Sequence, residues 1–171
     1  PWRVLVADDS KLNRRLLKHS LRFICPGWDV SDAATAEAAV AAVKAAHEGY
    51  ELIVMDEQFD TVIGSDVSQM RGSEAVRLIR AHETRMGAPR AVIVSCTGHA
   101  SRSTEPFFLE CGADAVWGKP FPNHMDGSMQ GELSPLLAMS RQHSGQHAHG
   151  SPSEAPAVTA AEHMFEQTAD S

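Results

Sequence analysis

The chain has 171 residues, of which 43% are hydrophobic, and this is enough to bury one core of ordinary size. Its formal net charge of −7 argues against a basic surface for nucleic acid or anionic lipid. No stretch is apolar for long enough to span a bilayer, and the amino end lacks a signal peptide's basic start and apolar run. We therefore expect a cytoplasmic module whose partners are other proteins or small ions.

Three cysteines, Cys25, Cys96 and Cys111, lack the spacing of metal ligands, and their odd number is typical of free thiols in a reducing compartment. The chain begins at Pro1 and enters a strand almost at once. We interpret it as a segment of a longer polypeptide.

The first half of the chain alternates short apolar runs with amphipathic stretches. Residues 3–7 form a predicted buried strand that ends in Asp8 and Asp9. A helix capped by Ser10 follows, and its apolar positions are Leu12, Leu16, Leu21 and Ile24. A brief strand at 28–30 precedes an alanine-rich helix at 36–46 that Thr35 caps. The next strand, residues 52–56, is apolar until it ends at Asp56.

The second half continues the alternation. A helix begins at Ser73, with Ala75, Leu78, Ile79, His82 and Met86 on one face. A strand at 91–95 runs into Thr97, and Thr104 opens a short helix that Gly112 ends. A fifth strand at 115–117 runs into Lys119.

Alternation through five strands predicts an α/β fold: a doubly wound, five-stranded parallel sheet of flavodoxin-like (βα)5 type. The last helix is poorly defined, because only residues 132–141 have a helical pattern after the Pro- and Gly-containing stretch from 122. Residues 142–171 are rich in His, Ser, Gly, Pro and Ala, and we expect them to be a disordered tail.

Four strand ends supply Asp8 with Asp9, Asp56, Thr97 and Lys119. In a doubly wound sheet these ends lie side by side, and ligands bind beyond them. Crowded carboxylates repel one another and favour a cation, for which Mg²⁺ is the natural candidate. A carboxylate can be a nucleophile toward phosphorus, while an ammonium and a hydroxyl can bind phosphoryl oxygens. The pattern therefore predicts a phosphoryl-accepting site.

At these residues the sequence resembles the receiver domains of two-component response regulators. The resemblance covers residues 2–121 and rests on the acidic pair in Val-Ala-Asp8-Asp9-Ser, the acceptor in Leu-Ile-Val-Met-Asp56, Thr97 in Ser-Cys-Thr-Gly, and Lys119 in Gly-Lys-Pro-Phe. It implies that Asp56 is phosphorylated by a phosphohistidine donor, with Thr97 and Lys119 as the other catalytic residues.

The resemblance also implies a magnesium site formed by Asp8, Asp9, Asp56 and the backbone carbonyl of Gln58, and a cis peptide bond before Pro120. The implied partner is a histidine kinase or a histidine phosphotransfer domain, and the chain could be the receiver of a hybrid histidine kinase. On this interpretation residues 2–141 are the receiver domain, and it is a signalling domain rather than an enzyme.

Two alternatives remain open at this point. A phosphatase of the haloacid dehalogenase type also uses a strand-end Asp with magnesium, but it needs a second acid where this chain has Gln58. A degenerate receiver that only scaffolds a partner is favoured by the unusually long segment between Gln58 and Gly72. The acidic pair, Asp56, Thr97 and Lys119 argue against it. His99, close to the predicted site, is expected to be exposed rather than catalytic.

Overall fold

The structure is a computed structural model that describes the backbone of residues 2–60 and 70–146 and the side chains of residues 2–60 and 70–139. The long segment between Gln58 and Gly72 therefore lies largely outside the described residues, as does most of the predicted tail.

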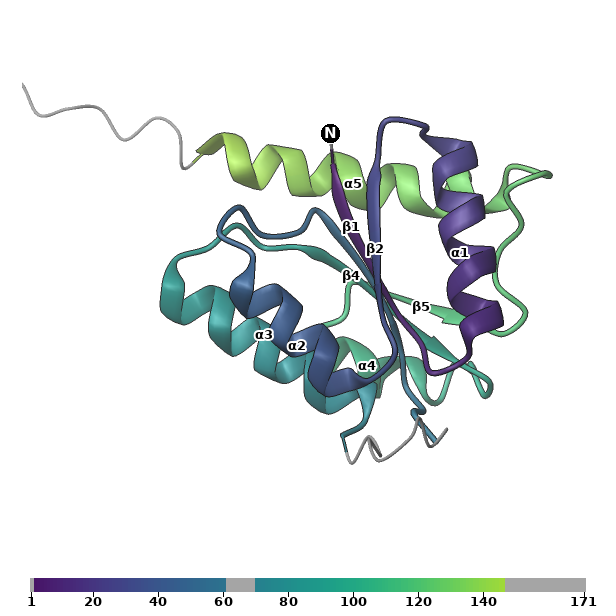
Figure 1. The fold of residues 1–171 in the computed structure, drawn as a ribbon, viewed down its shortest axis with the longest axis horizontal. Helices are drawn as coiled ribbons and strands as arrows, with labels where there is room; N and C mark the ends of the chain where they lie inside the picture. Colours follow the sequence, from purple (N-terminus) through teal and green to yellow (C-terminus); the bar gives the residue numbers. More distant parts are fainter. Residues whose placement is uncertain (1, 61–69, 147–171) are drawn as a thin grey trace, which may run out of the picture.

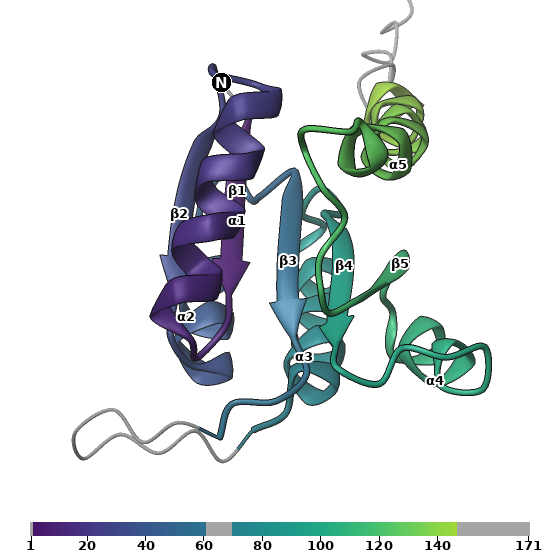
Figure 2. The same cartoon turned by 90° about the vertical axis from the view of Figure 1, so that its right-hand side faces the viewer.

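Five parallel strands form one sheet in the order β2-β1-β3-β4-β5. The strands are β1 (Arg3–Ala7), β2 (Asp29–Ala33), β3 (Leu52–Asp56), β4 (Val92–Thr97) and β5 (Ala115–Gly118). Every residue of β3 and β4 is buried, as expected for central strands that are covered on both faces. Figure 2 shows the strand arrowheads of β1, β3 and β4 pointing toward the same edge of the sheet. The predicted fold class is confirmed.

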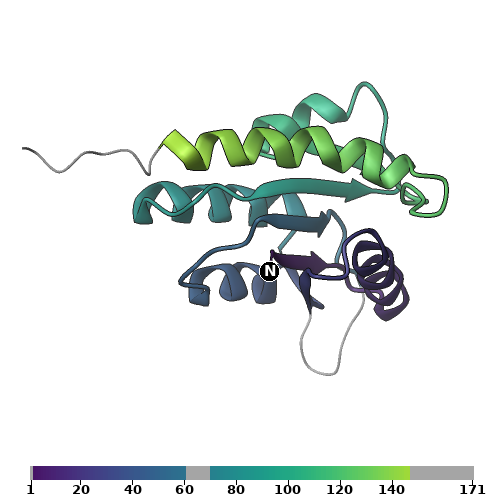
Figure 3. The same ribbon diagram turned by 90° about the horizontal axis from the view of Figure 1, so that it is seen from above.

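In the part of the chain that the structure describes, five helices cover the two faces of the sheet (Figure 1). They are α1 (Lys11–Ile24), α2 (Ala36–Ala45), α3 (Gly72–Met86), α4 (Glu105–Cys111) and α5 (Ser128–Gln146). Side chains of α2 and α3 share one core cluster with Leu5, Ile53 and Ile93. Side chains of α1 and α5 share the opposite cluster with Val6, Val54 and Trp117. Figure 3 shows α5 running beside β4 in the opposite chain direction.

The predicted starts of α1 and α2 are confirmed by their capping contacts, whereas α3 begins at Gly72, one residue before the predicted Ser73. The hydroxyl of Ser10 accepts a hydrogen bond from the Asn13 amide at 3.3 Å, and the hydroxyl of Thr35 accepts one from the Ala38 amide at 3.1 Å. The predicted end of α4 is also confirmed: Gly112, which follows its last residue, adopts a left-handed conformation with φ of 108°, which glycine tolerates. The Ser10 cap starts α1 two residues after Asp9 and so sets the distance between this helix and the end of β1.

The predicted buried faces of α1 and α3 are partly wrong. In α1, Leu12 and Leu16 are 65% and 52% exposed, while the residues that face the sheet are Leu17, Ser20 and Leu21. In α3, Leu78 and Met86 are exposed, and the buried positions include Val76 and Glu83. Burial of Ser20 and Glu83 is possible because each has a partner: His124 Nδ1 lies 2.8 Å from the Ser20 hydroxyl, and Glu83 accepts the Ala91 amide at 2.9 Å.

The last helix is longer than predicted. It begins at Ser128 instead of 132 and continues through Pro135 to Gln146, beyond the predicted start of the tail at 142. Met129, Leu133 and Leu137 recur every four residues and are all buried against the sheet, and this burial offsets the hydrogen bond that Pro135 cannot donate. None of the helices in residues 2–60 and 70–146 is long and apolar enough to cross a membrane.

Candidate functional site

Three carboxylates meet beyond the carboxyl ends of β1 and β3. These strands are neighbours, and Ala7 pairs with Met55, so Asp8 and Asp56 each follow a paired position. Carboxylate oxygens of Asp8, Asp9 and Asp56 all lie within 4.8 Å of one another. Asp8 is 1% exposed and Asp56 is 3% exposed, whereas Asp9 is half-buried. The fold therefore brings the predicted acidic residues together in a site with little access to water.

Lys119 joins two of these carboxylates. Its Nζ donates to Asp56 Oδ2 at 2.8 Å and to Asp8 Oδ2 at 3.2 Å. Its backbone amide donates to the Thr97 carbonyl at 3.0 Å, so the ends of β4 and β5 are held together. The peptide bond between Lys119 and Pro120 is cis, as predicted. One cation and three carboxylates thus occupy a single strand-end site.

Burial is the main influence on the protonation of Asp56. Burial raises the pKa of this carboxyl, the hydrogen bond from Lys119 lowers it, and the neighbouring charge of Asp8 raises it; together with the smaller effects of the Lys119 charge and the Glu57 amide, these leave the pKa at about 6. Burial lowers the pKa of Lys119, but the hydrogen bond and charges of Asp56 and Asp8 outweigh it and leave that pKa raised. At neutral pH Asp56 is therefore largely ionised, and Lys119 carries its positive charge.

Cys96 lies beside Asp56 in the sheet register and is fully buried. Burial and the Asp56 charge raise the pKa of its thiol well above the ordinary value. The Cys96 thiol is therefore neutral at physiological pH.

Thr97 ends β4, one residue beyond the position that pairs with Asp56. Its hydroxyl accepts a hydrogen bond from the His99 amide at 3.2 Å, and the His99 side chain is exposed, as expected. Gln58 follows Asp56 by two residues, and its side chain is exposed. Thr97 therefore lies at its predicted strand end, one step along β4 from the partner of Asp56, and Gln58 lies just beyond the end of β3.

Asn13 contacts the site and was not predicted. Its Nδ2 donates to both oxygens of Asp8, at 3.2 and 3.0 Å, and the Ser10 amide donates to the same carboxylate at 2.8 Å. With Lys119, these donors satisfy the buried charge of Asp8. The available signal is position: Asn13 lies three residues after the helix cap, where side chains turn back toward the preceding strand end.

The arrangement fits a hard divalent cation. Magnesium prefers oxygen ligands, takes one or two carboxylates in many protein sites and keeps several waters. Asp8, Asp9 and Asp56 offer such oxygens, and a cation would relieve the repulsion between them. Since Lys119 neutralises only part of the charge, the residues present fit Mg²⁺.

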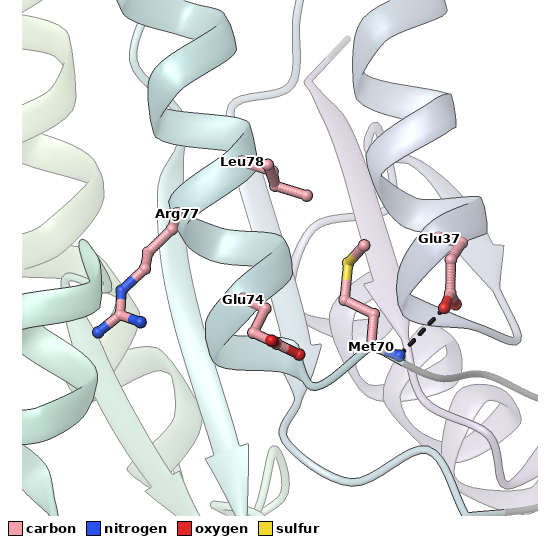
Figure 4. Close-up of a pocket in the computed structure, with 5 residues that line it drawn as sticks. All are labelled: Glu37, Met70, Glu74, Arg77 and Leu78. Atoms are coloured by element: carbon pink, nitrogen blue, oxygen red, sulfur yellow. Dashed lines mark hydrogen bonds between the residues drawn. The ribbon is translucent and has the colours of Figure 1, made fainter.

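A second concave surface lies between α2 and α3 (Figure 4). It is a pocket of about 480 Å³ that Glu37, Met70, Glu74, Arg77 and Leu78 line. Figure 4 shows Arg77 pointing away from the two acids, and its guanidinium lies 5.9 Å from the centroid of the Phe107 ring. The polar groups of this pocket do not converge on one point, in contrast to the three carboxylates at the strand ends.

Comparisons with known proteins agree with the geometry. A model of the response regulator receiver domain matches residues 4–125. The autoinducer 2 sensor kinase/phosphatase LuxQ of Vibrio vulnificus is 31% identical over 118 residues, which are 69% of this chain and 12% of LuxQ. The two-component response regulator ORR41 of Oryza sativa subsp. japonica is 30% identical over 118 residues, which are 69% of this chain and 83% of ORR41. The chain thus spans about an eighth of LuxQ but most of ORR41.

Solved structures show the same fold. The receiver domain of the Arabidopsis thaliana histidine kinase CKI1, complexed with Mg²⁺, is 26% identical, with a TM-score of 0.57 over 70% of this chain and 83% of that chain. A co-crystal structure of the Saccharomyces cerevisiae histidine phosphotransfer protein Ypd1 with the receiver domain of Ssk1 gives 26% identity and a TM-score of 0.58, over 70% of this chain and 79% of that chain. The match to the family model covers most of the chain and, apart from Arg3 at the start of β1, every residue of the five strands. The chain therefore belongs to the response regulator receiver domain family of two-component signalling.

Proposed function

We propose that this chain is the phosphoacceptor of a two-component phosphorelay, in which Asp56 accepts a phosphoryl group from a phosphohistidine donor. The observation that carries the proposal is the convergence of Asp56, two further carboxylates and Lys119 in one nearly buried site. The domain is then the substrate of its donor rather than an enzyme that turns over. A reducing, cytoplasmic location is part of the proposal and is supported by the three free cysteines.

The transfer forms one bond and breaks one bond. An Asp56 carboxylate oxygen attacks phosphorus, an oxygen–phosphorus bond forms, and the nitrogen–phosphorus bond of the donor breaks, with its electron pair returning to the imidazole. The attacking oxygen must be ionised, which the pKa of about 6 allows at neutral pH. The product is an acyl phosphate on Asp56.

The surrounding residues stabilise the transferred group. Lys119 Nζ, which lies 2.8 Å from Asp56 Oδ2, is placed to neutralise a phosphoryl oxygen. When bound by Asp8, Asp9, Asp56 and the Gln58 carbonyl, Mg²⁺ would supply positive charge at the developing phosphoryl oxygens. Thr97 would donate its hydroxyl to another of these oxygens.

A change at Thr97 would reach the connection between β4 and α4. At present the Thr97 hydroxyl accepts the His99 amide, and the Thr104 hydroxyl donates to the His99 carbonyl at 3.0 Å. If the Thr97 hydroxyl turns toward the phosphoryl group, the contact with His99 is lost. Phosphorylation would then shift the equilibrium between two conformations of this connection and alter partner binding.

The donor is proposed to bind over α1, which starts two residues after Asp9. Leu12, Leu16 and Phe23 are each more than half exposed on this helix, and Lys11 and Arg15 are exposed among them. Apolar side chains with a basic rim suit an acidic helical surface of a histidine phosphotransfer or histidine kinase domain.

The test is incubation of the domain with Mg²⁺ and acetyl phosphate, followed by intact mass spectrometry. The expected result is a gain of one phosphoryl group that requires Mg²⁺, is absent in Asp56→Asn and persists in Asp60→Asn, whose exposed carboxylate lies nearby in the chain. A folded wild-type domain that gains nothing would contradict the proposal and favour a scaffold that is never phosphorylated.

A further inference from the structure

Glu57 is a buried carboxylate for which the proposed phosphoryl chemistry has no use. It is only 9% exposed, and its side chain turns toward the start of α3. Oε2 accepts a hydrogen bond from the Ser73 amide at 2.8 Å, and Oε1 accepts one from the Ser73 hydroxyl at 3.0 Å. A buried carboxylate with two donors at a helix amino end is well stabilised by hydrogen bonding and by the helix dipole.

The backbone of Glu57 is held as firmly as its side chain. Its amide lies 2.9 Å from the Cys96 carbonyl and 2.9 Å from Asp56 Oδ1, and it donates to both. Its carbonyl accepts the Gly72 amide at 3.1 Å. Glu57 therefore connects the phosphoacceptor, the neighbouring strand and the first turn of α3.

Gly72 allows the first turn of α3 to approach the backbone of Asp56 closely. A Cβ at this position would lie 1.8 Å from the Asp56 carbonyl oxygen, so no side chain fits there. The start of α3 thus lies directly against the backbone of the acceptor. Any displacement of this turn would be transmitted to Asp56.

Gln58 lies between two anchored residues. On one side is Glu57 with its contacts to α3, and on the other is Phe59, which is 5% exposed in the core cluster of α2 and α3. We infer that Glu57 is a positioning residue. Its hydrogen bonds join the end of β3 to the start of α3 and thereby fix the Asp56 carboxylate and the Gln58 carbonyl in the orientation that Mg²⁺ binding requires. The inference rests on the proposed function, because it assigns Glu57 a role in that same site.

Three variants test the inference. Glu57→Ala removes both contacts with Ser73, whereas Glu57→Gln keeps an acceptor for the Ser73 amide. Glu83→Ala is the matched control: it removes an equally buried carboxylate at the other end of α3, where Glu83 accepts the Ala91 amide and pairs with Arg80. Mg²⁺ binding to the metal-free protein is followed by calorimetry, and urea unfolding is measured on the same samples.

Partners that orient metal ligands typically change affinity by about 10- to 100-fold, so Glu57→Ala is expected to raise the Mg²⁺ dissociation constant by at least about tenfold. Glu57→Gln should restore most of the affinity, to within about threefold of wild type. Glu83→Ala should lower stability while it leaves the Mg²⁺ affinity unchanged. This combination separates positioning from a general loss of stability.

The inference is overturned if folded Glu57→Ala binds Mg²⁺ like the wild type, or if Glu83→Ala weakens binding equally. If Glu57→Ala does not fold, Ser73→Pro replaces it, because proline in the first turn of a helix has neither the amide hydrogen nor the hydroxyl that Glu57 accepts; a weaker Mg²⁺ affinity supports the inference, and an unchanged one overturns it. Wild-type protein that binds no Mg²⁺ would instead contradict the proposed function. The two failures are therefore distinguishable.

Discussion

Replacement of Asp56 by Asn should stabilise the metal-free domain, and the gain should depend on pH. Burial raises the pKa of Asp56 from 3.8 to about 6. Between these values the folded domain holds a proton that the unfolded chain releases, so stability falls as pH rises through this window and is level above it. A shift of 2.2 units corresponds to about 3 kcal/mol of lost stability at neutral pH, and Asn, which cannot ionise, avoids this loss.

The assay is urea unfolding in EDTA, followed by the fluorescence of the tryptophans, of which Trp117 is fully buried. About 2 kcal/mol of the pH-dependent loss falls between pH 4.5 and 7.5, so the stability advantage of Asp56→Asn should grow by about 2 kcal/mol over that interval. Other titrating groups largely cancel in the difference between the two proteins. An advantage that is the same at both pH values would refute the argument that burial controls Asp56.

Three further predictions follow from particular contacts. The apparent Mg²⁺ affinity, measured by calorimetry, should be about tenfold weaker at pH 5 than above pH 7, because the cation must displace the proton of Asp56; a flat profile would contradict this. Gly72→Ala should destabilise by at least about 2 kcal/mol, whereas Gly27→Ala, which meets open space, should change urea stability by less than about 0.5 kcal/mol. Arg80→Ala should cost about 3 kcal/mol, since Arg80 donates to Gly112, Ala91 and Asp114; a loss below about 1 kcal/mol would contradict a structural role.

The sheet and the convergence of its strand ends could be predicted from the sequence because both depend on local patterns. Apolar runs mark β3 and β4, which are buried throughout, and parallel order follows from the alternation with helices. Once that order is known, Asp8, Asp56 and Lys119 must lie at the same edge. The contacts of Lys119 with both carboxylates confirm that expectation of proximity.

Helix faces and supporting residues could not be predicted in the same way, because they depend on partners distant in the chain. Leu16 is exposed, whereas Ser20 is buried. Ser20 can be buried because its hydroxyl has a hydrogen-bond partner, His124, more than a hundred residues away in the chain. Glu57 looks like an ordinary exposed acid until α3 places Ser73 beside it. Hydrophobic spacing carries no information about such pairs. The burial of Met129 in α5, in contrast, follows the four-residue spacing of Met129, Leu133 and Leu137, which can be read in the sequence.

The most direct test of the central claim is to identify the residue that carries the acyl phosphate. The domain is phosphorylated with acetyl phosphate and Mg²⁺, treated with sodium borohydride, which reduces an acyl phosphate to the alcohol, and mapped by peptide mass spectrometry. The account predicts reduction at Asp56 alone, with Asp8, Asp9 and Glu57 unmodified. Reduction at another carboxylate, or none in a protein that binds Mg²⁺, would contradict the assignment of Asp56 as the phosphoacceptor.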